Sequence, residues 1–205
     1  MYRREFLSYA AGIVTLPAVI DFQHRSRIEL LDLEENCCLR ESVAGYTAVL
    51  AELGFASRRS VLIVPAAARI PETAMRRMVT AMQAGGIVIL ESGAGFANEQ
   101  DLRAHRDTLR DCFAVRLNAP VQLWPRRTPY VDFTWPFATK LRDFSRVIPL
   151  DQPTDQTIGW VDGRPVALKR QAGRGTFIFL GSPLGPVLWA GDVDAKRWLL
   201  DVVRS

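Results

Sequence analysis

The stretch "GGIVILESGAGFANEQ", residues 85–100, decides the fold that we expect. Its apolar run Ile87–Leu90 is typical of a strand that is buried on both faces. The small residues that follow Ser92 indicate a tight turn, and a helix is expected over 98–113. A strand that leads through a turn into a helix is the repeating unit of parallel α/β sheets.

Two similar units precede this one. "RIELLDL" (27–33) predicts a strand, and Leu39, Val43, Tyr46, Leu50 and Leu53 recur at helical spacing before Gly54. "SVLIVP" (60–65) predicts a second strand, and a helix that begins at Pro71 ends at Gly85-Gly86. The first half therefore alternates strand and helix.

The second half has a different pattern. We expect a strand over 121–124, an aromatic loop over 124–137 and a short helix near 138–144. Asp162-Gly163 between two β-prone runs then predicts a hairpin, and a helix is expected from Asp194. We predict one α/β domain over 27–203. It is expected to be a three-layer sandwich with a mainly parallel sheet, helices on both faces and an antiparallel C-terminal hairpin.

Composition excludes several classes of protein. The chain has 205 residues, 23% of them charged, and a net charge of +4 spread along its length, which is typical of a folded domain and does not indicate nucleic-acid binding. Its three cysteines have neither a disulfide-framework pattern nor zinc-ligand spacing. We therefore expect neither a metal site nor a cofactor.

The first twenty residues, "MYRREFLSYAAGIVTLPAVI", have a basic start and an uncharged apolar run. That run is short for a membrane span but suits an export signal. Arg3-Arg4-Glu5-Phe6-Leu7 resembles the twin-arginine motif, which implies contact with the export machinery and a periplasmic or inner-membrane-tethered location. A helix of the domain itself is the alternative interpretation.

Three further stretches carry a resemblance to a known family: "VLIVPAAARIP" (61–71), "GGIVILESGAG" (85–95) and "RPVALKRQAGRGTFIFLGSPLG" (164–185). Together, over about 27–203, they resemble the class I glutamine amidotransferase-like fold. The likeness is closer to its non-catalytic branches, the trimerisation-type domains of some β-galactosidases and the ThuA-like proteins.

Active members of that family carry a cysteine in a Gly-x-Cys-x-Gly elbow and a histidine after the last strand. Here the elbow reads Leu90-Glu91-Ser92-Gly93-Ala94, and the loop 181–186 contains no histidine. The resemblance therefore implies a domain without catalysis. We expect it to bind a ligand, such as a carbohydrate, or a protein partner at the carboxyl edge of the sheet, and a homo-oligomer is one such assembly.

The alternative function is that of a hydrolase that uses Ser92 or Glu91. A serine hydroxyl needs a base, usually histidine. We expect His105 to be a core or edge histidine on the inner stripe of its helix, away from Ser92, although its helix directly follows the turn and could approach the sheet edge. Glu91 ends an apolar strand, where burial would raise its pKa and suit it to acid–base work. It could equally cap a backbone turn or pair with an arginine.

Five more residues are candidates for ligand binding. Gly93 and Gly95 could present backbone N–H groups to an anion, although the phosphate-loop lysine is missing. Tyr130, Asp132 and Trp135 could cover the pocket and stack on a sugar ring, or they could plug the sheet edge.

Overall fold

The structure is a computed structural model that describes residues 28–33, 37, 39–53, 57, 59–92, 95–96, 98–122, 130–142 and 146–205. The expected export signal, 1–20, lies outside the described residues, as does His24. Within the described ranges, no helix is both long and apolar enough to cross a membrane.

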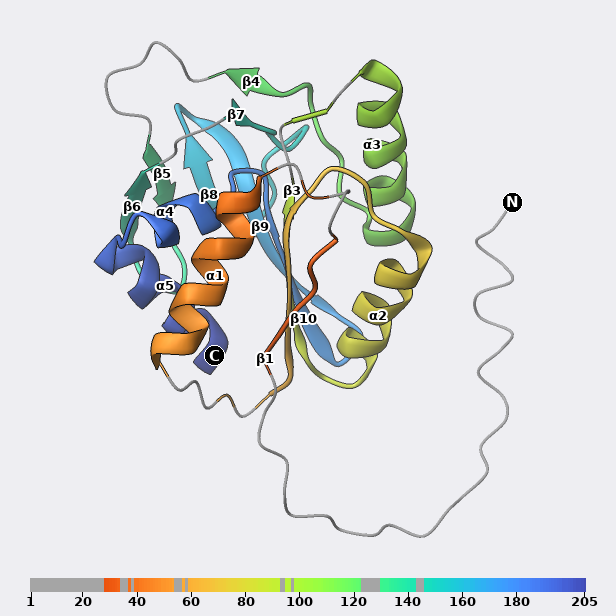
Figure 1. Ribbon diagram of the computed structural model, residues 1–205. Coiled ribbons are helices and arrows are strands. Elements are labelled where there is room, and N and C mark those ends of the chain that lie inside the picture. The colour runs from red at the N-terminus through yellow and green to blue at the C-terminus, as the bar shows by residue number, and fades with distance from the viewer. Residues whose placement is uncertain are drawn as a thin grey trace, which may run out of the picture.

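One sheet of eight strands forms the centre of the domain (Figure 1). In sheet order its strands are β1 (Ile28–Leu30), β2 (Val61–Ala67), β3 (Ile87–Ser92), β10 (Gly175–Leu180), β9 (Arg164–Ala172), β8 (Thr157–Val161), β5 (Tyr130–Phe133) and β6 (Thr139–Arg142). A separate pair is formed by β4 (Val121–Gln122) and β7 (Arg146–Val147). The helices are α1 (Arg40–Leu53), α2 (Glu72–Gln83), α3 (Glu99–Phe113), α4 (Gly185–Trp189) and α5 (Val193–Arg204).

The sheet is mixed, so the prediction of a three-layer sandwich with a mainly parallel sheet is wrong. The pairs β1–β2, β2–β3 and β3–β10 are parallel, whereas β10–β9, β9–β8, β8–β5 and β5–β6 are antiparallel. The antiparallel strands are thus half of a curled sheet, in which the expected hairpin is only one part (Figure 1).

The difference comes from the segment between α3 and β8. Two predictions for this segment are wrong where the structure describes it. Residues 130–133 of the predicted aromatic loop (124–137) and residues 139–142 of the predicted short helix (138–144) form the paired strands β5 and β6. Exposed and buried residues alternate along β5, and the two strands extend the antiparallel side beyond β8. Pairing between distant strands, rather than local pattern, sets this edge of the sheet.

Helices cover the parallel half on both faces (Figure 1). One core cluster joins α1, α4 and α5 to one face of the sheet, through residues such as Tyr46, Trp198 and Ile178. The second cluster joins α2 and α3 to the other face, through residues such as Met78 and Phe177. The first three helices lie where the sequence predicted them, and Asn98 caps α3 by accepting a hydrogen bond from the Asp101 N–H at 2.9 Å.

Candidate functional site

The candidate site lies at the carboxyl end of β3, where Glu91 and Ser92 follow one another. Successive side chains of a strand point to opposite faces of the sheet. Glu91 accordingly reaches α1 on one face, and Ser92 reaches α3 on the other. Both residues are fully buried, with 0% exposure.

The Glu91 carboxylate accepts five hydrogen bonds. Tyr46 Oη donates to Oε1 at 2.6 Å, and the backbone N–H groups of Leu184 and Gly185 donate to the same oxygen at 2.7 and 3.1 Å. Oε2 accepts from the Ser42 hydroxyl and from the Ala66 N–H, the latter at 3.1 Å. Glu91 therefore caps a backbone turn, which was one of the interpretations left open.

Local sequence places each of these donors. Ser42 and Tyr46 are four residues apart on α1 and so share one face of the helix. The register of β2 shifts between Val64 and Ala67, and Ala66 adopts a left-handed φ of 39° within that irregularity. A bulge of this kind re-aims a backbone group, and here it directs an N–H at the carboxylate.

Two glycines let α4 approach α1 closely enough to share the same carboxylate. A Cβ atom on Gly45 would lie 1.9 Å from the Gly185 carbonyl oxygen, and one on Gly185 would lie 2.4 Å from Ser42 Cα. No side chain fits between the two backbones. The N-terminus of α4 can therefore donate two N–H groups to Glu91 while Ser42 and Tyr46 donate from α1.

Burial dominates the electrostatics of this cluster. Desolvation raises the pKa of Glu91, and the hydrogen bonds from Ser42, Tyr46, Leu184 and Gly185 oppose that shift. The pKa of Tyr46 is raised well above its ordinary value, first by burial and then by the charge of Glu91. Tyr46 therefore stays protonated and remains a donor.

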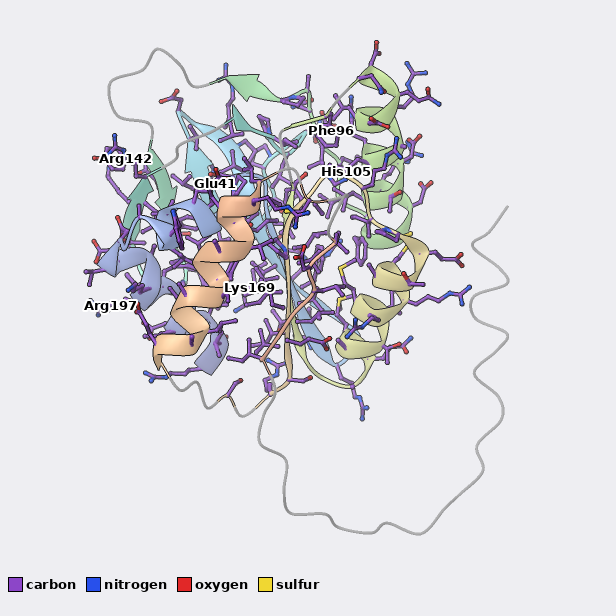
Figure 2. The ribbon with its side chains drawn as sticks, viewed as in Figure 1. Glu41, Phe96, His105, Arg142, Lys169 and Arg197 are labelled. Atoms are coloured by element: carbon purple, nitrogen blue, oxygen red, sulfur yellow. The ribbon has the colours of Figure 1, made fainter. Side chains whose placement is uncertain are left out.

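Ser92 does have an imidazole partner, so the prediction that His105 lies away from it is wrong. Ser92 Oγ and His105 Nε2 are 2.6 Å apart. Six residues connect β3 to α3, and α3 then runs back beside the sheet, which brings its second turn level with the end of β3. Figure 2 shows His105 and Phe96 on the side of α3 that faces the sheet, and their ring centroids are 5.1 Å apart.

The surroundings of His105 are those of a core residue. Burial lowers its pKa to about 4, although the Ala68 backbone acts to raise it, so the ring is neutral at physiological pH. Only 2% of the residue is exposed, and its Nδ1 has no hydrogen-bond partner among the described residues. In a Ser-His-Asp triad a carboxylate accepts the Nδ1 proton, and no described carboxylate takes that place here.

The structure does not bring the expected ligand-binding residues together. Three strands separate β5, which carries Tyr130 and Asp132, from β3, a distance of roughly 19 Å at ordinary strand spacing. Asp132 pairs with Lys140 at 3.2 Å, and the Trp135 carbonyl accepts a hydrogen bond from Trp198 Nε1 at 2.8 Å. Gly95 is exposed, and Gly93 lies outside the described residues.

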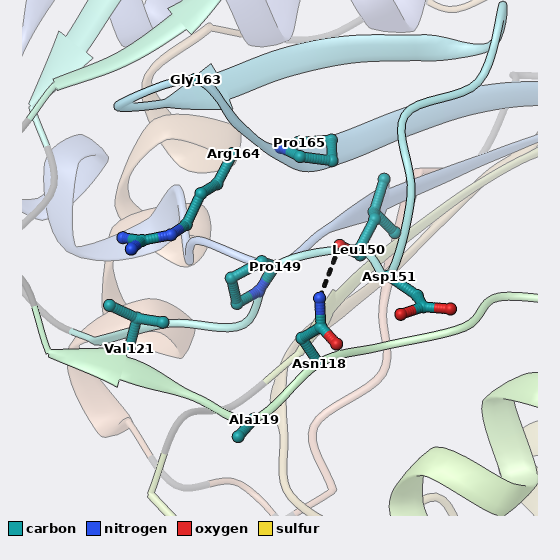
Figure 3. Close-up of a pocket in the computed structure, with 9 residues that line it drawn as sticks. All are labelled: Asn118, Ala119, Val121, Pro149, Leu150, Asp151, Gly163, Arg164 and Pro165. Atoms are coloured by element: carbon teal, nitrogen blue, oxygen red, sulfur yellow. Dashed lines mark hydrogen bonds between the residues drawn. The ribbon is translucent and has the colours of Figure 1, made fainter.

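A hollow in the surface lies elsewhere (Figure 3). It measures about 440 Å³ and lies between the segments 118–121 and 149–151 and the turn at Gly163. Asn118 Nδ2 donates to the Leu150 carbonyl at 3.3 Å and so joins two of its walls. None of the predicted site residues lines this hollow, and the described part of the chain holds no cluster of side chains suited to a metal ion.

The sequence could have indicated only part of this site. Glu91 and Ser92 were identified because they end an apolar strand. Ser42 was missed, although a polar residue four positions before Tyr46 on a helix is a usable signal. Ala66, Leu184 and Gly185 contribute backbone N–H groups, which no side-chain pattern announces.

The fold has counterparts among solved structures. The β-galactosidase from Rahnella sp. R3 aligns with a TM-score of 0.59 at 14% identity, over 83% of this chain and 31% of that one. The exo-β-1,4-mannosidase from Opitutaceae bacterium strain TAV5 gives 0.58 at 8% identity, over 87% of this chain and 36% of that one. A cytoplasmic protein from Salmonella typhimurium LT2 gives 0.55 at 12% identity, over 81% and 87%.

The fold occurs within β-galactosidases. The chain spans about a third of the length of the glycosidases that it matches, and at these identities the likeness concerns the fold alone. The likeness of fold agrees with the resemblance to β-galactosidase domains that the sequence suggested. It does not show a glutamine amidotransferase-like class or an export signal. No protein-family model and no curated protein sequence matches the chain.

Proposed function

We propose that this domain is non-catalytic and serves in protein assembly, by association with further copies of itself. The observation that carries the proposal is a pair of exposed apolar side chains at the two ends of the α4–α5 turn, Trp189 at the end of α4 and Val193 at the start of α5. Trp189 is 59% exposed and Val193 is 76% exposed. Tryptophan is the residue type that most often anchors protein interfaces.

Two observations support association with the same chain. Asp194 and Arg197 are both exposed and carry charges of opposite sign on α5, the helix that begins at Val193, so that this surface can complement a second copy of itself. The fold also occurs within β-galactosidases, of which it spans about a third. A trimerisation-type role, as in the resemblance drawn from the sequence, agrees with both.

Light scattering coupled to size-exclusion chromatography tests the proposal. We expect an oligomer for the native chain and a smaller species for the double variant Trp189→Ser/Val193→Ser. Tyr130→Ser is the matched control, because Tyr130 is also an exposed aromatic residue but lies on β5. A native chain that is monomeric, or equal effects of the two changes, contradicts assembly through this turn. A change of tryptophan fluorescence with galactose in a monomeric native chain, lost in Trp189→Ser, would instead indicate carbohydrate binding.

The contact between Ser92 and His105 favours a second candidate, a serine hydrolase. A neutral imidazole 2.6 Å from a hydroxyl is the pairing that activates such a nucleophile. Against it, both residues are buried, and neither described hollow includes them. A fluorophosphonate probe separates the candidates. Labelling of the native chain that is lost in Ser92→Ala would establish a hydrolase, and we expect no labelling.

We also propose that the protein is exported, on the strength of Arg3-Arg4 and the apolar run that follows. Fractionation of cells that express the native chain or Arg3→Lys/Arg4→Lys tests this. We expect the substitution to lower the periplasmic or membrane-tethered amount. An unchanged distribution contradicts a twin-arginine signal.

A further inference from the structure

A second hollow of about 170 Å³ lies on the face of the sheet that α3 covers, beyond the C-terminal end of that helix. Its walls come from the loop after α3, from the segment before β8 and from β9. They are formed by Ala114, Val115, Arg116, Leu150, Asp151, Gln152, Thr154, Gln156, Leu168 and Arg170. Typical pockets for drug-sized ligands are about 300–1,000 Å³, so this one suits a small group.

Arg170 is held in the wall by aromatic packing. It pairs across the sheet with Phe177, and its guanidinium carbon lies 5.5 Å from the centroid of that ring. Phe177 stacks in turn on Phe113, at 5.0 Å between centroids and 3° between ring planes. A guanidinium fixed in this way has already lost much of its conformational freedom and can bind at a lower entropic cost.

Arg170 is also a partly buried cation without a counter-charge. Among the described residues it forms no ion pair, and burial lowers its pKa from the ordinary value. A cation that is partly removed from water and left uncompensated is costly, and an anionic ligand would offset that cost.

Arg116 is a second arginine in the wall of the same hollow. The Asp151 N–H donates to its carbonyl at 2.9 Å, which fixes this wall against the segment before β8. Arg116 forms no ion pair with any described carboxylate. Asp151 is the one acidic residue in the wall, so the lining keeps a net charge of +1, from two arginines and one aspartate.

We infer that this hollow binds a small oxyanion, a carboxylate or a phosphate, between Arg116 and Arg170. The planar fork of a guanidinium matches both anions with paired hydrogen bonds. Thr154 and Gln152 add uncharged polar groups to the same wall. The site is distinct from Glu91 and Ser92 and does not depend on the assembly proposed above.

Titrations of the full chain with sodium phosphate and with sodium acetate, each against sodium chloride at equal ionic strength, test the inference. The readout is the melting temperature together with backbone amide NMR shifts. We expect saturable binding of at least one anion, with shifts at 114–116 and 168–170. Arg170→Gln should weaken it by at least about tenfold. Arg116→Gln should weaken anion binding as well, and because Arg116 is exposed, this change leaves the core intact.

Arg164→Gln is the matched control, because it removes the same charge from the wall of the larger hollow (Figure 3). It should leave the affinity unchanged. Saturation by phosphate alone would assign the site to phosphate groups, and saturation by acetate would extend it to carboxylates. No saturable binding of either anion, or equal weakening by all three variants, overturns the inference.

Discussion

At the scale of single residues, burial determines the chemistry of the β3 terminus. Acid–base and nucleophilic sites are built from glutamate, serine and histidine. Here all three residues, Glu91, Ser92 and His105, are buried in the fold. The carboxylate is occupied by five donors, and the serine and the histidine satisfy each other. Their first role is therefore to hold α1, α3 and α4 on the sheet.

The pKa of His105 predicts a pH dependence of stability. The folded value of about 4 lies below the ordinary 6.5, so the unfolded state binds more protons between these values, and stability falls as the pH falls through that window. The loss between pH 7.5 and pH 4 attributable to His105 is about 3 kcal/mol. Urea unfolding at both pH values measures this loss. Between pH 7.5 and pH 4 the free energy of unfolding of His105→Gln should fall by about 3 kcal/mol less than that of the native chain. Ser92→Ala, which keeps the imidazole, should retain the full dependence. A native pH dependence in His105→Gln contradicts the assignment.

The donors around Glu91 predict that its charge matters for stability. Glu91→Gln keeps the shape but turns an amide NH₂ toward one of the backbone N–H groups, which loses its acceptor and costs about 1–3 kcal/mol. Tyr46→Phe removes one donor and leaves four, so the loss should be nearer about 1 kcal/mol. Urea midpoints at constant m-value measure both.

Glu99→Gln is the control for Glu91→Gln. It is the same chemical change, but Glu99 is exposed and forms a surface ion pair with Arg103. It should stay within about 0.5 kcal/mol of the native chain. If Glu91→Gln is equally mild, the carboxylate does not hold the three elements together.

At the scale of elements, α1 packs against the sheet and α4 with a different face from the one that the apolar stripe predicted. The predicted apolar stripe included Val43 and Leu50, which are only partly buried, whereas Ser42, Gly45, Tyr46 and Val49 form the buried face. Small residues on that face let α4 lie against α1, and this contact carries the N–H groups of Leu184 and Gly185 to Glu91. Close packing rather than hydrophobicity selected the face.

Gly45→Ala tests this helix contact. In an isolated helix the change would stabilise by roughly 0.5–1 kcal/mol, but here the added Cβ would meet the Gly185 carbonyl oxygen at 1.9 Å. Backbone cannot move aside cheaply, so we expect a net loss of about 1–3 kcal/mol by urea unfolding. Thr47→Ala, on the exposed side of the same helix, should be close to neutral. A neutral or stabilising Gly45→Ala would contradict the close approach of α1 and α4.

At the scale of the whole molecule, the order of the sheet places the most protected strands at its centre. β2, β3 and β10 are fully buried along their length, whereas β1 and β6 are the two edges. Lys140 and Arg142 lie on the β6 edge, where charged side chains discourage unintended strand pairing. The charged β6 edge is thus protected against pairing with a further strand.

Hydrogen exchange measured by mass spectrometry tests this view of the molecule. Amides of β3 and β10 should exchange most slowly, and those of β6 should exchange fastest among the strands of the sheet. Dilution that dissociates an oligomer should leave the β6 rate unchanged if association uses the α4–α5 turn. A β6 that is as protected as β3 in the assembled protein would indicate pairing of edge strands between copies.

Local sequence alone determined the elements of the first half and the hairpin at Asp162-Gly163. Continuous apolar runs, an Asn cap and turn residues act over a few positions, so they can be read without the rest of the chain. Tertiary structure alone decided the rest of the antiparallel half, above all β5 and β6, and the partners of the site. Glu91 meets Tyr46 and Leu184 across 45 and 93 residues, and Ser92 meets an imidazole because α3 folds back beside its own strand. Such contacts depend on which surfaces pack together, and no local pattern specifies that choice.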